Sequence, residues 1–151
     1  MRVTICAVGR LKAGAERDLI EKYTKRIQWP FEIVQIEERR KLLPAELKRR
    51  EQELISNAIP DGAIRVALDE RGTPMSSSAF SEKLARWRDD GRDVAFLIGG
   101  AGGLAPELRK SADFVLSFGK ATWPHMLARV MLVEQIYRAQ EILAGHPYHR
   151  E

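Results

Sequence analysis

Residues 99–103, Gly-Gly-Ala-Gly-Gly, form the stretch of this sequence best suited to hold a ligand. They directly follow the apolar run 93–98, and glycines let a ligand approach the backbone closely. In open α/β sheets, ligands bind outside the carboxyl ends of the strands. Residues 100–105 also fit the G-x-G-x-x-A dinucleotide pattern, but the acidic residue expected about 20 residues further on is missing. We therefore expect a small-molecule site here, with a plain turn as the alternative, and no nicotinamide or flavin site.

A second loop, residues 118–125, has the same setting because it follows an expected strand and precedes the longest expected helix. Residues 68–72 would supply a third wall, again at the end of a strand. Loops of this kind offer backbone donors and acceptors at one edge of a parallel sheet. Together the three loops could enclose one small ligand.

The C-terminus holds an unusual group of side chains, with Tyr148, His149 and Arg150 side by side and His146 close by. Chain ends are usually frayed and uninformative, and that interpretation, or a residual tag, is the alternative. Two histidines three residues apart suggest a metal, but no third ligand with metal-site spacing accompanies them. We expect no metal site.

Other chemical signatures are weak. The sequence contains no serine–histidine–acid arrangement with a nucleophile elbow, no phosphate-binding loop and no cysteine pair. The single cysteine, Cys6, falls in an expected core strand, which favours packing over reactivity. Residues 39–41 and 48–50 place six cations within twelve residues, with only Glu46 among them. These cations fit a solvated helix face and a phosphate-contacting patch equally well.

Length and composition narrow the class of protein. The chain has 151 residues and 17.2 kDa, which fits one domain over residues 1–151. A net charge of +4 and a pI near 9.4 permit binding to a polyanion without demonstrating it. No apolar run approaches the ~20 residues of a membrane-spanning helix, and the N-terminal run is too short for a signal peptide. The single cysteine cannot form an internal disulfide. The sequence therefore indicates a soluble protein of a reducing compartment, the cytoplasm.

Strands alternate with helices from end to end. Hydrophobic periodicity and turn signals predict strands at 3–8, 31–36, 64–69, 93–98 and 114–118, and helices at 15–27, 44–58, 76–90, 106–112 and 124–143. This alternation predicts a single-domain α/β fold with a mostly parallel sheet and helices on both faces.

The last helix carries more apolar surface than one contact needs. Met126, Val130, Val133 and Tyr137 form one stripe, and further apolar residues widen it. Burial on two sides, against the sheet and against a second copy of the chain, would explain this breadth. The alternative is that these positions fill one wide face.

Taken together, residues 97–104, residues 117–125 and the terminal Tyr148-His149-Arg150 resemble the ribosomal large subunit methyltransferase H family of the SPOUT class. The resemblance covers essentially the whole chain, and the three motifs in this order are far more specific than any one alone. One departure is visible, because Gly119 stands where related sequences often carry serine.

The resemblance implies a SPOUT-type α/β knot in the C-terminal part of the fold, a topology that pattern reasoning alone would not propose. It implies S-adenosylmethionine as cofactor and N3 of a pseudouridine in 23S rRNA, within the assembled ribosome, as the methylated atom. It also implies a homodimer whose partner chain completes the active site. The cofactor would be held chiefly by backbone groups of Gly99, Gly100, Phe118, Gly119, Lys120, Ala121, Thr122 and Trp123, with Leu68 packing beside it. Replacing Gly99 by valine would then remove cofactor binding and leave the fold largely intact.

The terminal residues are the candidate catalytic groups under this resemblance. The N3 proton must leave during transfer, which requires a base or a positive environment for the ring anion. We assign His149 as candidate base or proton shuttle, Arg150 as anion stabiliser or phosphate contact, and Tyr148 as stacking or hydrogen-bonding partner. The competing hypothesis is a non-enzymatic RNA- or ribosome-binding module that uses the basic segments.

Overall fold

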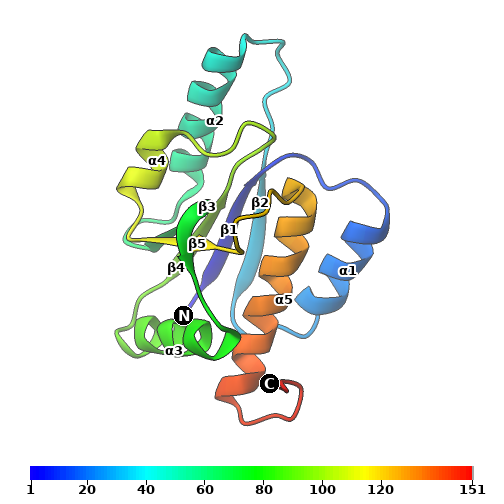
Figure 1. The fold of residues 1–151 in the computed structure, drawn as a ribbon, viewed down its shortest axis with the longest axis vertical. Helices are drawn as coiled ribbons and strands as arrows, with labels where there is room; N and C mark the ends of the chain where they lie inside the picture. Colours follow the sequence, from blue (N-terminus) through cyan, green and yellow to red (C-terminus); the bar gives the residue numbers. More distant parts are fainter. Residues whose placement is uncertain (151) are drawn as a thin grey trace.

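A five-stranded sheet with strand order β2-β1-β4-β3-β5, all neighbours parallel, organises the chain (Figure 1). The structure is a computed structural model that describes residues 1–150. Its strands are β1 (Val3–Val8), β2 (Phe31–Ile36), β3 (Ile64–Pro74), β4 (Val94–Ile98) and β5 (Phe114–Ser117). Its helices are α1 (Ala15–Thr24), α2 (Pro44–Ala58), α3 (Ser77–Asp89), α4 (Pro106–Ser111) and α5 (His125–Leu143). The predicted α/β fold with a parallel sheet is confirmed.

Helices cover both faces of the sheet, as Figure 1 shows, with α1, α3 and α5 on one face and α2 and α4 on the other. Alternate residues of β1 serve the two resulting cores: Ile5 packs with the α1, α3 and α5 side, and Cys6 with the α2 and α4 side. The central strands β1 and β4 are buried at every position. This two-sided burial explains their continuous apolar sequence.

Local signals account for several helix starts. The Ser76 side chain accepts a hydrogen bond from the backbone N–H of Ala79 at 3.1 Å and so caps α3. Pro44 and Pro106 open α2 and α4 in the first turn, where proline's missing N–H carries no penalty. In the described part of the chain, no helix is long and apolar enough to cross a membrane.

Strand β3 runs five residues past its predicted end at residue 69. Its pairing with β5 shifts register between Leu68 and Thr73, so residues 69–72 bulge away from the ladder. A Cβ at Gly72 would lie 2.5 Å from the carbonyl oxygen of Val115, so only glycine permits this close approach of the two strands. A hydrophobic pattern does not reveal such a bulge, and for that reason the predicted strand ended too early.

The wide apolar surface of α5 is largely used within the chain. The helix lies on the sheet between α1 and α3, and contacts both. Val133 and Tyr137, from the predicted interface stripe, are only 0% and 7% exposed. These two residues are buried within the chain and do not face a second copy, whereas the predicted homodimer itself stays a prediction. The apolar breadth reflects burial against three elements of the same chain.

Arg129, in the second turn of α5, is completely buried. Its Nη2 donates to the carbonyl oxygens of Val8 and Gly9, at 3.1 and 3.0 Å, at the carboxyl end of β1. Its Nε and Nη1 have no hydrogen-bond partner among residues 1–150, and burial lowers its pKa. Arg129 thus fixes the start of α5 against the edge of the sheet where the ligand-binding loops were predicted.

We expect Arg129→Ala to lower the free energy of unfolding by about 2–5 kcal/mol, because it removes two hydrogen bonds and opens a cavity in the core. Arg129→Met should lose less, since it fills most of the volume and removes a buried charge. Urea unfolding followed by circular dichroism measures both. An Arg129→Ala protein as stable as the wild type would contradict this role.

Candidate functional site

A cavity of about 420 Å³ lies at the carboxyl ends of β3, β4 and β5. It is enclosed by the bulge of β3, the glycine loop after β4 and the loop between β5 and α5, which are the three walls expected from the sequence. Of the residues predicted to hold a cofactor, the lining includes Leu68, Gly99, Gly100, Phe118, Gly119, Ala121, Thr122 and Trp123. Lys120 is exposed and does not line the cavity.

The glycine loop folds back on itself to form one wall. The N–H of Gly103 donates to the carbonyl oxygen of Gly100 at 2.9 Å, and Gly103 has a φ of +74°. A Cβ at Gly99 would lie 2.6 Å from the backbone nitrogen of Leu104, and one at Gly100 would lie 2.9 Å from a methyl group of Val8. Any side chain at Gly99 would therefore displace the backbone of this loop, and the effect expected of Gly99→Val on cofactor binding stays a prediction.

The opposite wall, residues 118–124, is held by a serine that the sequence analysis missed. Gly119 N–H donates to the Ser117 hydroxyl at 3.0 Å. The same hydroxyl lies 3.2 Å from the carbonyl oxygen of Glu70 and 3.1 Å from that of Gly119, and it can donate to either. Ser117 therefore ties this loop to the β3 bulge. Nothing in the local sequence distinguishes it from any serine at a strand end.

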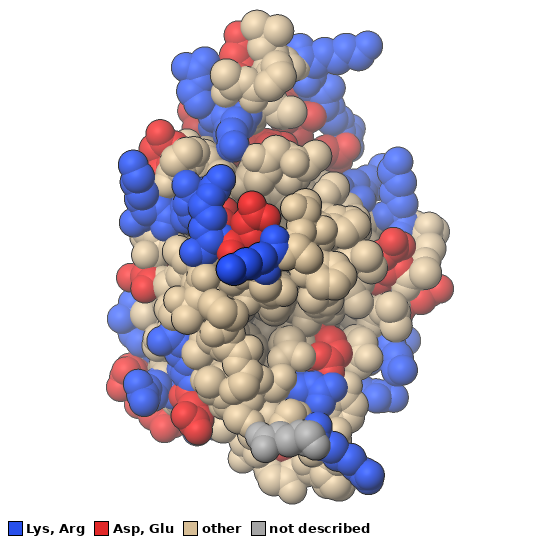
Figure 2. Space-filling view, in the orientation of Figure 1, with Lys and Arg blue, Asp and Glu red and all other residues tan. Residues whose placement is uncertain are grey.

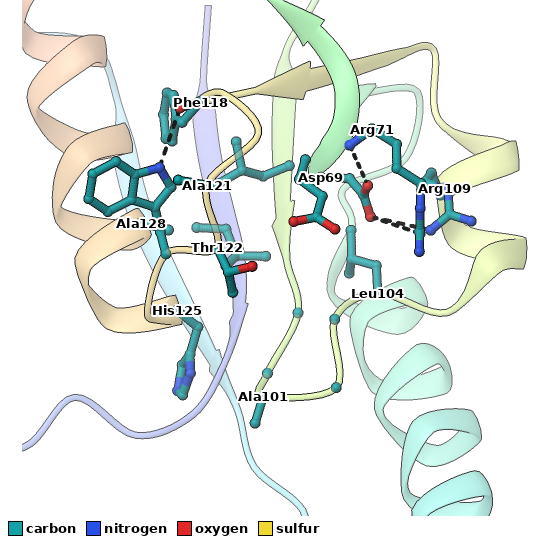
Figure 3. Close-up of a pocket in the computed structure, with 18 of the residues that line it drawn as sticks. Asp69, Arg71, Ala101, Leu104, Arg109, Phe118, Ala121, Thr122, His125 and Ala128 are labelled. Carbon is teal, nitrogen blue, oxygen red and sulfur yellow. Dashed lines mark hydrogen bonds and ion pairs between the residues drawn. The ribbon is translucent and has the colours of Figure 1, made fainter.

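Gly119 adopts a φ of +104°, a conformation that side-chain-bearing residues rarely reach. Trp123 lies further along the same loop and donates from its indole N–H to the carbonyl oxygen of Phe118 at 3.3 Å (Figure 3). Figure 3 also shows Thr122 and Leu104 on facing sides of the cavity. The loop thus presents mainly backbone groups and small side chains to a ligand.

A charged cluster closes the third side of the cavity. The Asp69 carboxylate, on the β3 bulge, lies 3.2 Å from Nη1 of Arg109 and 3.8 Å from Nη1 of Arg71 (Figure 3). Its other oxygen accepts the backbone N–H of Arg71 at 2.9 Å. The cluster joins the bulge to α4. Asp69 and Arg109 are forty residues apart in the sequence, so no local pattern predicts the pair.

The predicted catalytic tail is docked on the far end of α5 and is not a frayed end. The Tyr148 hydroxyl donates to Oε1 of Glu134 at 2.9 Å, and its ring lies edge-on to Tyr137 with centroids 4.8 Å apart. Nη1 of Arg138 lies 3.1 Å from Nδ1 of His149. Burial, and the hydrogen bond to Glu134, raise the pKa of Tyr148. The tail is therefore an ordered cluster, in which Arg150 is exposed.

The tail and the cavity of one chain do not meet. The cavity borders His125 at the start of α5, whereas the tail packs on Glu134 and Arg138, nine and thirteen residues further along. At 1.5 Å per residue these two contacts lie about 14 and 20 Å from His125 along the helix axis. In Figure 1, α5 starts near the carboxyl ends of the strands and the red tail lies at the opposite end of the molecule.

The basic segments 39–41 and 48–50 surround the start of α2, and Figure 2 shows Lys and Arg side chains gathered there. Part of their charge is balanced, because the Glu38 carboxylate lies 2.9 Å from Arg40 and 3.0 Å from Arg50. Hydrogen bonds from Arg40 and Arg50 lower the pKa of Glu38 to about 2. Lys48 lines the cavity, which places one of these cations at its border.

Cys6 is fully buried, and burial raises the pKa of its thiol to about 11, so it packs in the core as predicted. The described residues contain no group of three His, Cys, Asp or Glu side chains that could hold a metal ion.

We expect Gly99→Ala to weaken ligand binding to the cavity by at least about tenfold, since a displacement of the loop by a few tenths of an ångström breaks its backbone contacts. Gly102→Ala is the matched control, because a Cβ at Gly102 meets nothing within 4 Å. Calorimetric titration with S-adenosylmethionine measures both affinities. Equal affinities of the two variants would place the ligand elsewhere.

Comparison with known proteins gives a consistent result. Residues 1–149 match the family described as predicted SPOUT methyltransferase. The chain is 56% identical over 151 residues to the ribosomal RNA large subunit methyltransferase H of Rhodospirillum centenum, with 99% of both chains covered. A probable methylase family protein from Haemophilus influenzae has a similar fold, with a TM-score of 0.60 at 10% identity over 99% of this chain and 70% of that one.

The SpoU methyltransferase AviRb from Streptomyces viridochromogenes, solved in complex with the cofactor AdoMet, has a TM-score of 0.50 at 14% identity. The match covers 93% of this chain and 58% of that one. These structural likenesses show the fold, and the sequence matches show the family. The chain belongs to the SPOUT methyltransferase family, among the relatives named ribosomal RNA large subunit methyltransferase H.

Proposed function

We propose that the protein transfers a methyl group from S-adenosylmethionine to N3 of a pseudouridine in 23S rRNA, on the assembled ribosome in the cytoplasm. The observation that carries the proposal is the backbone-lined cavity at the carboxyl ends of three parallel strands, in a chain of this family. The non-enzymatic binding module is not supported, because the relatives are methyltransferases and the three predicted loops do enclose a cavity.

The cavity fits such a cofactor in size and in character. Its volume of about 420 Å³ falls within the roughly 300–1,000 Å³ of small-molecule sites. Its glycine loop leaves space that a Cβ would fill, and residues 118–123 offer backbone donors and acceptors. These residues would hold the adenosine and methionine parts chiefly through main-chain hydrogen bonds. Main-chain hydrogen bonds do not depend on the side chain. Gly119 can therefore make them although related sequences often carry serine at this position.

When bound, the cofactor supplies an electrophilic methyl group on a positively charged sulfur. The two glycine-containing walls would fix its orientation, since in-line transfer depends on near-attack geometry between donor and acceptor. The cationic side chains of the tail cluster, Arg138 and Arg150, would stabilise the negative charge that develops on the pyrimidine ring as its N3 proton leaves.

A homodimer would bring the two halves of the site together, because the contacts of the tail on α5 begin about 14 Å from the helix start that borders the cavity of the same chain. Large apolar side chains that are exposed on the single chain offer a surface for this homodimer. Trp123, which lies just before α5, and Leu127, in the first turn of α5, are 44% and 39% exposed. Leu19 of α1, 40% exposed, lines a groove of about 550 Å³ with Met131 and Glu134. We propose that this strip is the interface, and that the C-terminal part of each chain is knotted.

The shared site can be tested by complementation between two inactive variants. One is Thr122→Trp, which fills the cavity; the other ends at Pro147 and lacks the tail. Random reassortment makes roughly half of the dimers mixed, and each mixed dimer has one intact site of two, so about a quarter of wild-type activity should return. Single-turnover methylation of ribosomes measures it. No recovery, with mixed dimers confirmed by native mass spectrometry, would place the whole site in one chain.

The substrate is tested by mass mapping of 23S rRNA from cells with and without the protein. We expect one pseudouridine-containing fragment to lose the mass of one methyl group when the protein is absent, and to regain it when purified protein and S-adenosylmethionine are added to those ribosomes. An unchanged fragment map would contradict the assigned substrate. Methylation of free 23S rRNA but not of ribosomes would contradict only the ribosomal context.

A further inference from the structure

We propose that two loops beside the cavity, residues 9–14 after β1 and residues 37–43 after β2, bind the phosphate backbone of the substrate RNA through Arg10, Lys12 and Lys41. These two segments are called the basic loops below. The assignment rests on the proposed function, since it names the surface on which the RNA of that reaction docks.

The topology of the sheet places the basic loops next to the cavity. All neighbouring strands are parallel, so their carboxyl ends share one edge of the sheet. In the order β2-β1-β4-β3-β5, the cavity lies at the ends of β4, β3 and β5, and the basic loops follow the two remaining strands. Adjacent strands are about 4.8 Å apart, so the ends of β1 and β2 lie about 5 and 10 Å from that of β4. An RNA strand that delivers a base to the cavity can therefore run across both basic loops.

The first basic loop is fixed beside the wall of the cavity. A Cβ at Gly9 would lie 3.2 Å from Nε2 of His125, a residue that borders the cavity. The N–H of Gly9 donates to the carbonyl oxygen of Ile36 at 2.8 Å, at the end of β2. Arg10 and Lys12 are exposed, and neither forms an ion pair with any of residues 1–150. Both charges are thus available to a ligand from solvent.

The second basic loop is held by Glu38, whose side chain is only 8% exposed. Its Oε1 accepts the backbone N–H of Arg40 at 3.1 Å, and its Oε2 lies 3.0 Å from Nε of Arg50 in α2. The charges of these two arginines are therefore partly balanced within the chain. Lys41 is exposed and has no ion pair among residues 1–150. A loop fixed before binding loses less conformational entropy when a ligand docks on it.

The two edges of the sheet differ in charge. The loops at the cavity edge carry seven Lys and Arg against four Asp and Glu, in residues 9–14, 37–43, 69–72, 99–105 and 118–124. The segments at the opposite edge carry five against four, in residues 1–2, 25–30, 59–63, 90–93, 112–113 and 144–150. Figure 2 shows Lys and Arg side chains standing out around the start of α2 and near the start of α1. The excess positive charge thus lies at the edge that carries the cavity.

RNA fits this surface better than other polyanions do. Its phosphates recur along one strand, so a single strand can meet cations on two successive loops while one of its bases occupies the cavity. Lys120 adds an exposed cation on the far side of the cavity, in the loop between β5 and α5. Contacts between phosphates and lysine or arginine position a nucleic acid without reading its sequence. We therefore assign the basic loops to docking, and the choice of nucleotide to other groups.

The salt dependence of ribosome binding tests the assignment. The variants are Arg10→Gln/Lys12→Gln in the first basic loop and Lys41→Gln in the second. Ribosomes from cells that lack the protein are titrated without cofactor between about 0.05 and 0.3 M salt, and we expect the slope of log K against log salt to fall by about 0.7–0.9 for each lost phosphate contact. The double variant should also bind at least about tenfold more weakly at the lowest salt.

Arg2→Gln/Arg86→Gln is the matched control, because it removes two exposed cations from the opposite edge of the sheet. Its slope should equal that of the wild type, and affinity for S-adenosylmethionine should be unchanged in every variant. Equal slopes for the control and the basic-loop variants would overturn the proposal. So would a loss of affinity for ribosomes without the same loss for free 23S rRNA, because the partner of the loops would then be a ribosomal protein.

The docking surface and the proposed reaction fail in different ways. If the wild type binds ribosomes with the expected pattern of slopes but transfers no methyl group to them, the proposed reaction is wrong and the docking surface stands. If the wild type methylates ribosomes while the basic-loop variants bind them like the wild type, the reaction stands and the RNA docks elsewhere. A wild type that binds neither ribosomes nor 23S rRNA would overturn both.

Discussion

The rigidity of α5 is the constraint on which the proposed site depends. This helix of 19 residues crosses one face of the sheet, held at its start by Arg129 and along its length by α1 and α3. Its first residue borders the cavity and its last turns carry the tail cluster. Because a packed helix cannot shorten or fold back, the two groups stay separated within one chain. A second copy is the simplest way to bring a tail to a cavity.

The two halves of the site are built on different principles. The cavity is made of backbone held in unusual conformations, with Gly103 and Gly119 at positive φ and Gly99 pressed against the neighbouring turn. The tail cluster is made of side chains that satisfy one another around the Glu134 carboxylate. A cavity lined by fixed backbone groups suits a cofactor, because the same molecule binds there in every turnover. The tail cluster places the Arg138 guanidinium, which is paired with Glu134, beside Tyr148 and His149.

The sequence predicted the sheet, most element bounds and the cavity walls, because these follow from hydrophobic periodicity and from loops at strand ends. It did not predict the β3 bulge, which needs only Gly72 and leaves the hydrophobic pattern unchanged. It also placed Val133 and Tyr137 at a dimer interface, whereas both are buried within the chain. A broad apolar helix has the same sequence pattern whether it packs on its own chain or on another. Pairs distant in the sequence, Asp69 with Arg109 and Glu134 with Tyr148, have no local signature.

The most direct test of a site shared between two chains is cross-linking between the cavity and the tail. In a Thr122→Cys/Tyr148→Cys protein incubated with S-adenosylmethionine and a short bismaleimide, the account predicts covalent pairs of chains on a denaturing gel, and none from either single variant. Cys6 does not interfere, because it is fully buried. A linker that joined the two thiols of one chain would leave that chain at its single-chain mass, so only covalent pairs of chains count in favour of a shared site. Chains that remain single, in a protein shown to be dimeric, would contradict the account.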